Sequence, residues 1–212
     1  KKGEARFIGH LDVARFWERV FRRVDLPIAY SQGFNPQARL QFASALPVGI
    51  AGENELLDVW LIECMEPAEW FDRIRSNLPP GFVLHDIGEV PLKSPAMQAS
   101  LRYGVYKVYL RSEISQDELR ARVQNLLSQE TILRPHQKKT AKTYDLRPLF
   151  DSLAVHNECG VVVLEMKLRT GQHGNARASE VLSVLGIEDG RYTINRMELM
   201  LDEPVVDAVV AG

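Results

Sequence analysis

The side chains best suited to chemistry in this sequence are arginines near the N-terminus that recur at helical spacing. Apolar residues between positions 10 and 24 recur every three or four residues, which predicts a helix. Its polar face carries Arg15, Arg19, Arg22 and Arg23, with only Glu18 among them. Arginine suits phosphate because it offers two parallel N–H donors. The stripe predicts an anion-binding surface; an ordinary solvated helix face is the alternative.

A second concentration of positive charge lies between residues 134 and 147. This segment holds five basic side chains and one acidic one, and His136 and Tyr144 add groups that stack on bases. Charge and stacking together favour a nucleic-acid backbone as the ligand, whereas an ordinary surface loop is the plain alternative. The basic residues are Arg134, Lys138, Lys139, Lys142 and Arg147.

A third candidate is the glycine-bearing segment between Arg169 and Arg177, which contains Gly171 and Gly174. It connects a predicted strand to a predicted helix, so backbone N–H groups and the helix N-terminus are placed to hold a phosphate. The glycine spacing matches neither a Walker A loop nor a dinucleotide-binding loop. A plain strand–helix connection is the alternative.

Catalysis is not indicated by the residues themselves. The five histidines are scattered; His10 and His173 are the best candidates for acid–base chemistry, and His10 at a helix start is typical of capping or packing. Two distant cysteines, Cys64 and Cys159, do not supply the three or four clustered ligands of a zinc or iron–sulfur site. We therefore expect no metal and no cofactor.

Composition sets only broad limits on function. The chain has 212 residues, 45% of them hydrophobic, and a formal net charge of −2, so only the local distribution of charge bears on nucleic-acid binding. Apolar runs are too short to span a membrane, and no signal peptide is recognisable. Two unpaired cysteines suit a reducing compartment. These features predict a cytoplasmic protein with no membrane contact.

Hydrophobic periodicity divides the chain into two halves of similar element order. In the first half we expect a helix over residues 10–24, strands over 28–30, 40–43, 55–63 and 83–90, and a helix from Pro67. In the second half we expect strands over 101–110, near Ile132, 161–168 and 192–201, with helices over 116–128 and 176–185. The predicted class is α+β, with two tandem ferredoxin-like (β-α-β-β-α-β) units. Their expected extents are residues 1–91 and 100–212, joined by a linker over 92–99.

The first half also carries a dense motif block. It contains Arg6-Phe7-Ile8-Gly9-His10-Leu11-Asp12, then residues 26–36 ending in Ser31-Gln32-Gly33-Phe34-Asn35-Pro36, and then Leu46-Pro47-Val48-Gly49 and Glu55-Leu56-Leu57-Asp58-Val59. This block resembles the bacterial radical-SAM-linked domain family of unknown function, and the resemblance extends over nearly the whole chain. It differs where Gln37-Ala38-Arg39 replaces the family's usual His-Pro-Lys, although Arg39 retains the positive charge.

The resemblance implies a radical-SAM protein encoded nearby as partner, and an RNA context. The chain lacks the three-cysteine cluster motif, so it is not itself the radical-SAM catalyst. The leading hypothesis is an RNA-binding accessory protein that presents RNA to this partner. One alternative is a metal-independent RNA endonuclease of duplicated ferredoxin-like type that uses His10 or His173. The other is a protein–protein adaptor that does not bind RNA.

Overall fold

The structure is a computed structural model that describes residues 1–111, 114–135, 143–172, 174–188 and 190–202. Its first half contains η1 (Gly3–Phe7), α1 (His10–Arg23), β1 (Leu40–Phe42), β2 (Ala51–Gly52), β3 (Leu57–Val59) and α2 (Pro67–Arg75). The remaining elements are α3 (Met97–Ser100), β4 (Leu101–Leu110), α4 (Gln116–Leu127), β5 (Leu133–Pro135), β6 (Thr143–Asp145), η2 (Arg147–Leu149), β7 (Phe150–Glu158), β8 (Val161–Arg169), α5 (Ala178–Val184) and β9 (Tyr192–Leu201).

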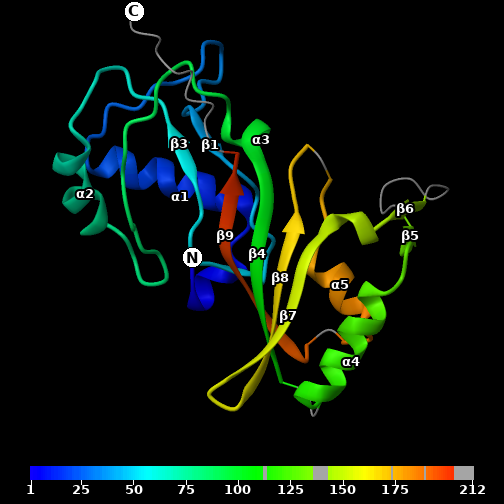
Figure 1. The fold of residues 1–212 in the computed structure, drawn as a ribbon. Coiled ribbons are helices and arrows are strands. Elements are labelled where there is room, and N and C mark those ends of the chain that lie inside the picture. Colours follow the sequence, from blue (N-terminus) through cyan, green and yellow to red (C-terminus); the bar gives the residue numbers. More distant parts are fainter. Residues whose placement is uncertain (112–113, 136–142, 173, 189, 203–212) are drawn as a thin grey trace, which may run out of the picture.

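A five-stranded sheet forms the centre of the molecule, with strand order β2-β9-β4-β8-β7 (Figure 1). The four long strands pair antiparallel, whereas β2 lies parallel to β9 and pairs Ala51 with Asn195. Burial alternates along β4 because every second side chain of a strand points to the same face of the sheet. Its Tyr106, Val108 and Leu110 are buried on the face that contributes to the main core.

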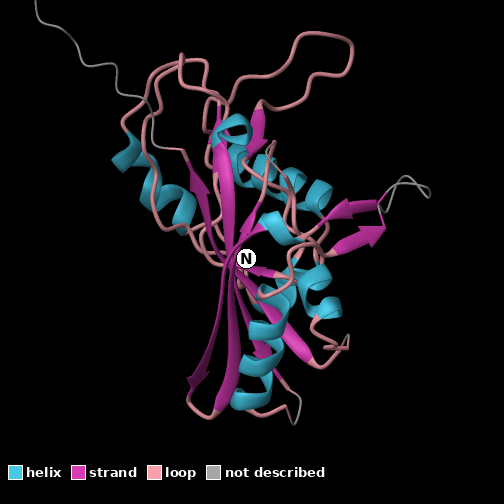
Figure 2. Cartoon of the chain, turned by 45° about the vertical axis from the view of Figure 1, so that its right-hand side comes forward, coloured by secondary structure: helices cyan, strands magenta, loops and turns pink. Residues whose placement is uncertain are grey.

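Helices α4 and α5 cover that face of the sheet (Figures 1 and 2). The core between them contains Leu119 and Val123 from α4, Val181 and Leu182 from α5, and Met166 from β8. Helix α4 begins as its sequence predicts, because the Ser115 side chain accepts a hydrogen bond from the backbone N–H of Glu118.

The first half of the chain lies beyond the β2–β9 edge of this sheet (Figure 1). Strands β1 and β3 form a two-stranded antiparallel sheet, and α1 and α2 pack with it around Val20, Phe21, Trp70 and Ile74. Helix α1 ends before Pro27, because Leu26 donates its backbone N–H to Phe21 O at 2.9 Å while Asp25 adopts a φ of 59°. This is a Schellman ending with an aspartate in the position that glycine usually takes.

The chain is a mixed α and β protein, which agrees with the predicted α+β class. Strands β4 and β9 and helices α1, α2 and α4 lie where the sequence predicts them. The second half follows the order β-α-β-β-α-β, but its second strand is β7 rather than a strand at Ile132; the short β5–β6 hairpin is additional.

The predicted duplication is not confirmed. Residues 83–90 form no strand despite their alternation. Of the strand predicted over residues 55–63, only β3 forms, and it lies in the two-stranded sheet. Single backbone hydrogen bonds extend β3 toward its neighbours without a continuous ladder; for instance, Trp60 donates its N–H to Arg39 O. The domain limits of 1–91 and 100–212 stay a prediction, and β2 joins the sheet of the second half across them.

Candidate functional site

Three arginines of α1 line a surface groove of about 520 Å³. Arg15, Arg19 and Arg23 follow one another at intervals of four residues, so they stand along one side of the helix, opposite the buried Val13 and Phe21. The groove is lined by Asp12, Arg15, Phe16, Arg19, Val20, Arg23, Ser76, Asn77, Leu78 and Pro79. Its second wall is therefore the turn that follows α2.

The positive charge of this groove is largely uncompensated. Arg15 forms an exposed ion pair with Asp12, with Nη1 and Oδ1 3.3 Å apart. Arg19 and Arg23 are exposed, and their side chains form no hydrogen bond or ion pair with any other residue that the structure describes. Asp12 does not cap the helix, because Gly9 occupies the N-cap position. The groove thus presents two arginine side chains that are available to a ligand.

The opposite wall combines Ser76 and Asn77, whose side chains are already hydrogen-bonded, with the apolar Leu78 and Pro79. Ser76 donates its hydroxyl to Asp72 O at 2.8 Å, and the Asn77 amide donates to Arg73 O at 2.9 Å. Both contacts close the C-terminal turn of α2, the end at which a helix dipole is negative. The wall therefore offsets part of the arginine charge and sets the width of the groove, while the arginines supply the donors.

Arg22 and Arg39 lie away from this groove, although the sequence grouped Arg22 with the stripe. Arg22 is close enough to Tyr30 to oppose the rise in its pKa, which burial and the neighbouring Glu18 cause. The guanidinium of Arg39 lies 5.0 Å from the centre of the Trp60 ring. The predicted stripe is thus divided between two flanks of α1.

A second basic group stands beside α5, on the far side of the sheet from α1 (Figure 1). Arg134 donates to the Ser183 hydroxyl at 3.2 Å. The positive charges of Arg134 and Arg177 both lie close enough to Tyr144 to oppose the rise in its pKa. The Glu180 carboxylate accepts the backbone N–H of Arg177 at 3.2 Å. A carboxylate therefore already occupies the start of α5, where the sequence suggested that a phosphate would bind.

The pH dependence of stability tests this second cluster. Burial and the hydrogen bond to Glu180 raise the pKa of Tyr144 to about 12, above the value near 10 of an exposed tyrosine. The neutral phenol therefore stabilises the fold fully below pH 10, and this contribution is lost as the pH rises from 10 to 12. In urea unfolding, the advantage of the wild type over Tyr144→Phe should stay constant below pH 10 and shrink above it. An advantage that is unchanged at pH 12 would contradict this assignment.

Two further predicted phosphate ligands contact the protein itself. Arg147 donates through Nη2 to Leu127 O at 3.0 Å and through Nε to Gln129 O at 3.2 Å, which caps the end of α4. Arg169 lies 5.7 Å from the centre of the Tyr103 ring, which the Lys167 ammonium also approaches at 4.5 Å. These contacts explain both arginines without a ligand.

The glycine-bearing loop before α5 has a packing role. Gly171 has a φ of 93°, and a Cβ at that position would lie 2.5 Å from the backbone oxygen of Leu101. The loop is closed by the Thr170 hydroxyl, which donates to the Asn175 side-chain oxygen at 3.2 Å. Glycine is thus required here for close approach to β4.

Of the two acid–base candidates, the structure describes His10. The His10 ring packs edge-on against Phe42 with centroids 5.0 Å apart, and it forms no hydrogen bond with another described residue. His173, Lys138, Lys139 and Lys142 lie outside the described residues. Across the described ranges, no three His, Cys, Asp or Glu side chains gather as metal ligands. Both Cys64 and Cys159 are free and exposed.

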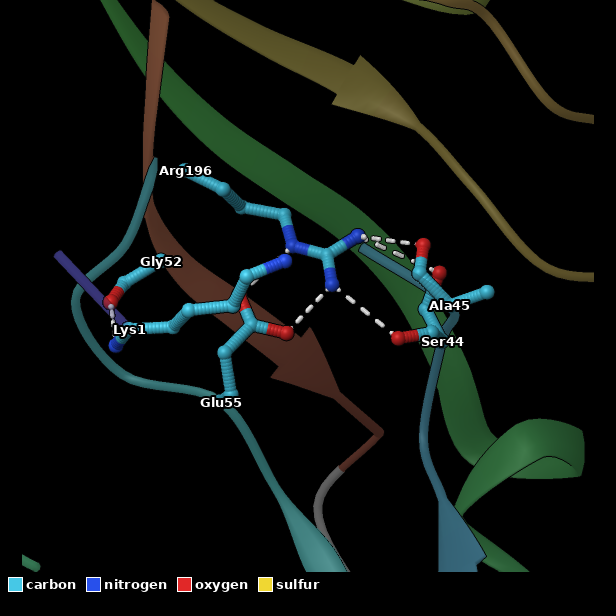
Figure 3. Close-up of polar contacts among 6 residues, drawn as sticks. All are labelled: Lys1, Ser44, Ala45, Gly52, Glu55 and Arg196. Carbon is cyan, nitrogen blue, oxygen red and sulfur yellow. Dashed lines mark hydrogen bonds and ion pairs between the residues drawn. The ribbon is translucent and has the colours of Figure 1, made fainter. Parts of the chain in front are cut away.

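A buried ion pair that the sequence did not indicate joins the two halves of the chain. Arg196 on β9 is 1% exposed and forms two hydrogen bonds with the Glu55 carboxylate, one of them from Nε to Oε1 at 2.8 Å (Figure 3). It also donates to Ser44 O at 3.0 Å and to Ala45 O at 3.3 Å. The available signal was that Arg196 stands two residues after the buried Ile194, on an inward-facing strand position.

Comparison with known proteins assigns the chain to a family. A family model described as an uncharacterized protein conserved in bacteria (DUF2344) matches residues 1–178. The chain belongs to this family. The match includes the whole arginine groove, whereas β9 and Arg196 lie beyond it. A search of curated proteins gives no match. None of the helices in the described ranges is long and apolar enough to cross a bilayer.

Proposed function

We propose that this protein binds RNA through the arginine groove of α1 and acts as an accessory protein that presents the RNA to a radical-SAM partner. The observation that supports RNA binding is the row of Arg15, Arg19 and Arg23 along one open groove, two of them without a partner in the described part of the chain. Arginine contacts to phosphate supply most of the affinity of such sites. The proposal of a radical-SAM partner rests on the resemblance of the motif block to the radical-SAM-linked domain family.

The proposed surface is narrower than the sequence suggested. The basic residues fall into separate groups: the groove of α1, the flank with Arg22 and Arg39, and the cluster of Arg134 and Arg177 beside α5 (Figure 1). The residues of these groups come from different elements of the fold. We therefore confine the phosphate contacts to the groove.

The second half of the chain supports the proposal only through the likeness of its fold to ferredoxin-like units. Its strand order β9-β4-β8-β7 and its β-α-β-β-α-β sequence of elements are those of a ferredoxin-like unit. We propose that residues 100–202 form one such unit. Because many functions share this fold, the analogy does not identify the ligand.

A matched pair of double variants tests the RNA proposal. Arg19→Ala/Arg23→Ala removes two groove charges, and Arg120→Ala/Arg191→Ala removes two exposed arginines elsewhere. In the described part of the chain, the ion pair of each control arginine is an exposed one with the acid three residues before it. Alanine preserves α1 because it is a strong helix former. The groove variant should bind single-stranded RNA more weakly. The slope of log affinity against log salt should become shallower by about 1.4, or about 0.7 for each phosphate that is no longer neutralised.

Fluorescence anisotropy with labelled RNA at several salt concentrations measures both quantities. The control variant should differ little from the wild type. Equal losses of affinity in the two variants would mean that only net charge matters, and salt-independent or absent binding by the wild type would reject the proposal.

A protein–protein adaptor is the second candidate. Phe7, Leu11 and Val48 are exposed to 59%, 72% and 60%. The backbone hydrogen bond from Gly49 N–H to Arg6 O at 2.9 Å brings the segment of Val48 beside that of Phe7. Co-purification with a radical-SAM protein from nuclease-treated lysate, and its loss in Leu11→Glu, would favour this function. The nuclease alternative has no supporting contact among the described residues.

A further inference from the structure

The segment Ser31–Gln37 forms a closed loop whose position is fixed at its base. Ser31 donates its backbone N–H to Gln37 O at 2.8 Å, and Gln37 donates its own N–H to the Ser31 hydroxyl at 2.9 Å. Tyr30 and Ala38 add an antiparallel bridge directly below these contacts. In Figure 1 the loop is the blue segment that precedes β1, at the upper edge of the molecule.

Phe34 stands at the tip of this loop, and its side chain is fully exposed, at 106% of the reference area. A buried phenylalanine would stabilise the fold through its apolar area, but this ring contributes no such burial. The closed base nevertheless fixes where the ring is presented. The ring is therefore accessible to a ligand.

Aromatic and cationic side chains surround the base of the loop. Tyr30 is exposed beside Arg22, and Arg39 lies over Trp60. The loop itself contains the amides of Gln32, Asn35 and Gln37 and no acidic residue. The carboxylate of Glu18 accepts a hydrogen bond from the Tyr30 hydroxyl at 3.4 Å, so one acid contacts this group.

This combination is the chemistry of single-stranded nucleic-acid sites. Aromatic rings stack on unpaired bases, arginines contact phosphates, and amides offer both donors and acceptors to base edges. A protein pocket would accept Phe34 equally well, but it would not account for the exposed arginines beside an acid-free loop. Helix α1 also connects the groove with the loop. Arg23 lines the groove, and the adjacent Arg22 lies near Tyr30 at the base of the loop.

We infer that Phe34 stacks on an unpaired base of the RNA whose phosphates occupy the arginine groove, so that the ligand is single-stranded RNA. This inference rests on the proposed RNA-binding function. It assigns the two features different roles: the arginines supply charge, whereas Phe34 supplies a stacking surface that carries no charge. Their variants should therefore differ in salt dependence.

The test uses the full chain with oligouridine as single strand and with the same strand annealed to oligoadenine as duplex. Phe34→Ala should weaken binding of the single strand by roughly 5- to 150-fold, the range expected when one stacked base loses its ring partner. Phe34→Tyr should retain affinity because the ring remains. Duplex binding and the salt slope should be unchanged in both variants, unlike in Arg19→Ala/Arg23→Ala. Because Phe34 is fully exposed, thermal unfolding should match that of the wild type.

The outcomes separate this inference from the function on which it rests. If Phe34→Ala binds the single strand like the wild type while the arginine variant does not, the inference is overturned and RNA binding stands. If the wild type binds neither RNA, both fail. If RNA affinity is unchanged in Phe34→Ala but a co-purifying radical-SAM protein is lost, the ring belongs to a protein interface and the inference is overturned.

Discussion

Replacement of Glu55 by alanine should lower the free energy of unfolding by about 3–5 kcal/mol, because it leaves the guanidinium of Arg196 buried without a counter-charge. The lower end of this range is expected, since the Glu55 side chain is 22% exposed and water can partly replace it. The backbone oxygens of Ser44 and Ala45 would still accept hydrogen bonds, but they carry no formal charge. Urea unfolding followed by circular dichroism at neutral pH measures the change.

Glu53→Ala is the matched control. Glu53 is two residues away and about as exposed as Glu55, but its partner Lys2 is 49% exposed and stays hydrated when the carboxylate is lost, so the replacement should cost less than about 1 kcal/mol. The double variant Glu55→Met/Arg196→Met, which removes both charges and keeps apolar volume, should recover most of the stability. Equal destabilisation by Glu55→Ala and Glu53→Ala would show that the buried pair does not stabilise the junction of the two halves.

Phe82→Ala should destabilise the protein by about 3–5 kcal/mol through the cavity that it leaves beneath α1. The Phe82 ring is 9% exposed, stacks on Phe16 with centroids 4.1 Å apart and meets Trp17 edge-on at 6.3 Å. Phe16 also lines the arginine groove, so removal of the Phe82 ring should loosen α1 and be visible as faster amide exchange in that helix.

The neighbouring Val83 provides the control for that change. It is 54% exposed, and Val83→Ala should alter the free energy of unfolding by no more than about 0.5 kcal/mol. Similar effects at the two positions would mean that the aromatic cluster does not anchor α1.

The parts of the fold that local periodicity determines could be predicted from the sequence. Burial alternates along β4 from Gly104 to Leu110, and along β9 from Ile194 to Arg196, before the irregularity at Met197. Helix α1 has an apolar stripe, and the limits of all three elements agree with expectation. Strand β7 was missed because it is an edge strand with two adjacent exposed residues, Asp151 and Ser152, at a bulge that breaks its alternation. The sequence predicts a strand over residues 83–90, but these residues have no neighbouring strand. A strand forms only where its backbone pairs with that of another strand, so a local pattern alone does not produce one.

In the candidate site, too, local features could be predicted from the sequence, whereas contacts between distant segments could not. The spacing of Arg15, Arg19 and Arg23 is local, so their common side of α1 follows from the sequence, and the groove includes all three. The opposite wall at Ser76 and Asn77 comes from the end of α2, more than fifty residues later, and no local pattern indicates that it lies there. The partners Glu55 and Arg196 are 141 residues apart, so their pairing depends on the tertiary fold alone.

That separation has a consequence for how the chain folds as it is made. Strand β9 lies between β2 and β4, so the first half cannot join the sheet until residues 192–201 have been synthesised. At about 5–20 residues per second, Glu55 waits roughly 7–28 seconds for Arg196 to be added. During that interval β2 has no neighbouring strand, and the Glu55 carboxylate lacks the Arg196 guanidinium. A fragment cut at residue 178, where the family match ends, would remain in that state permanently.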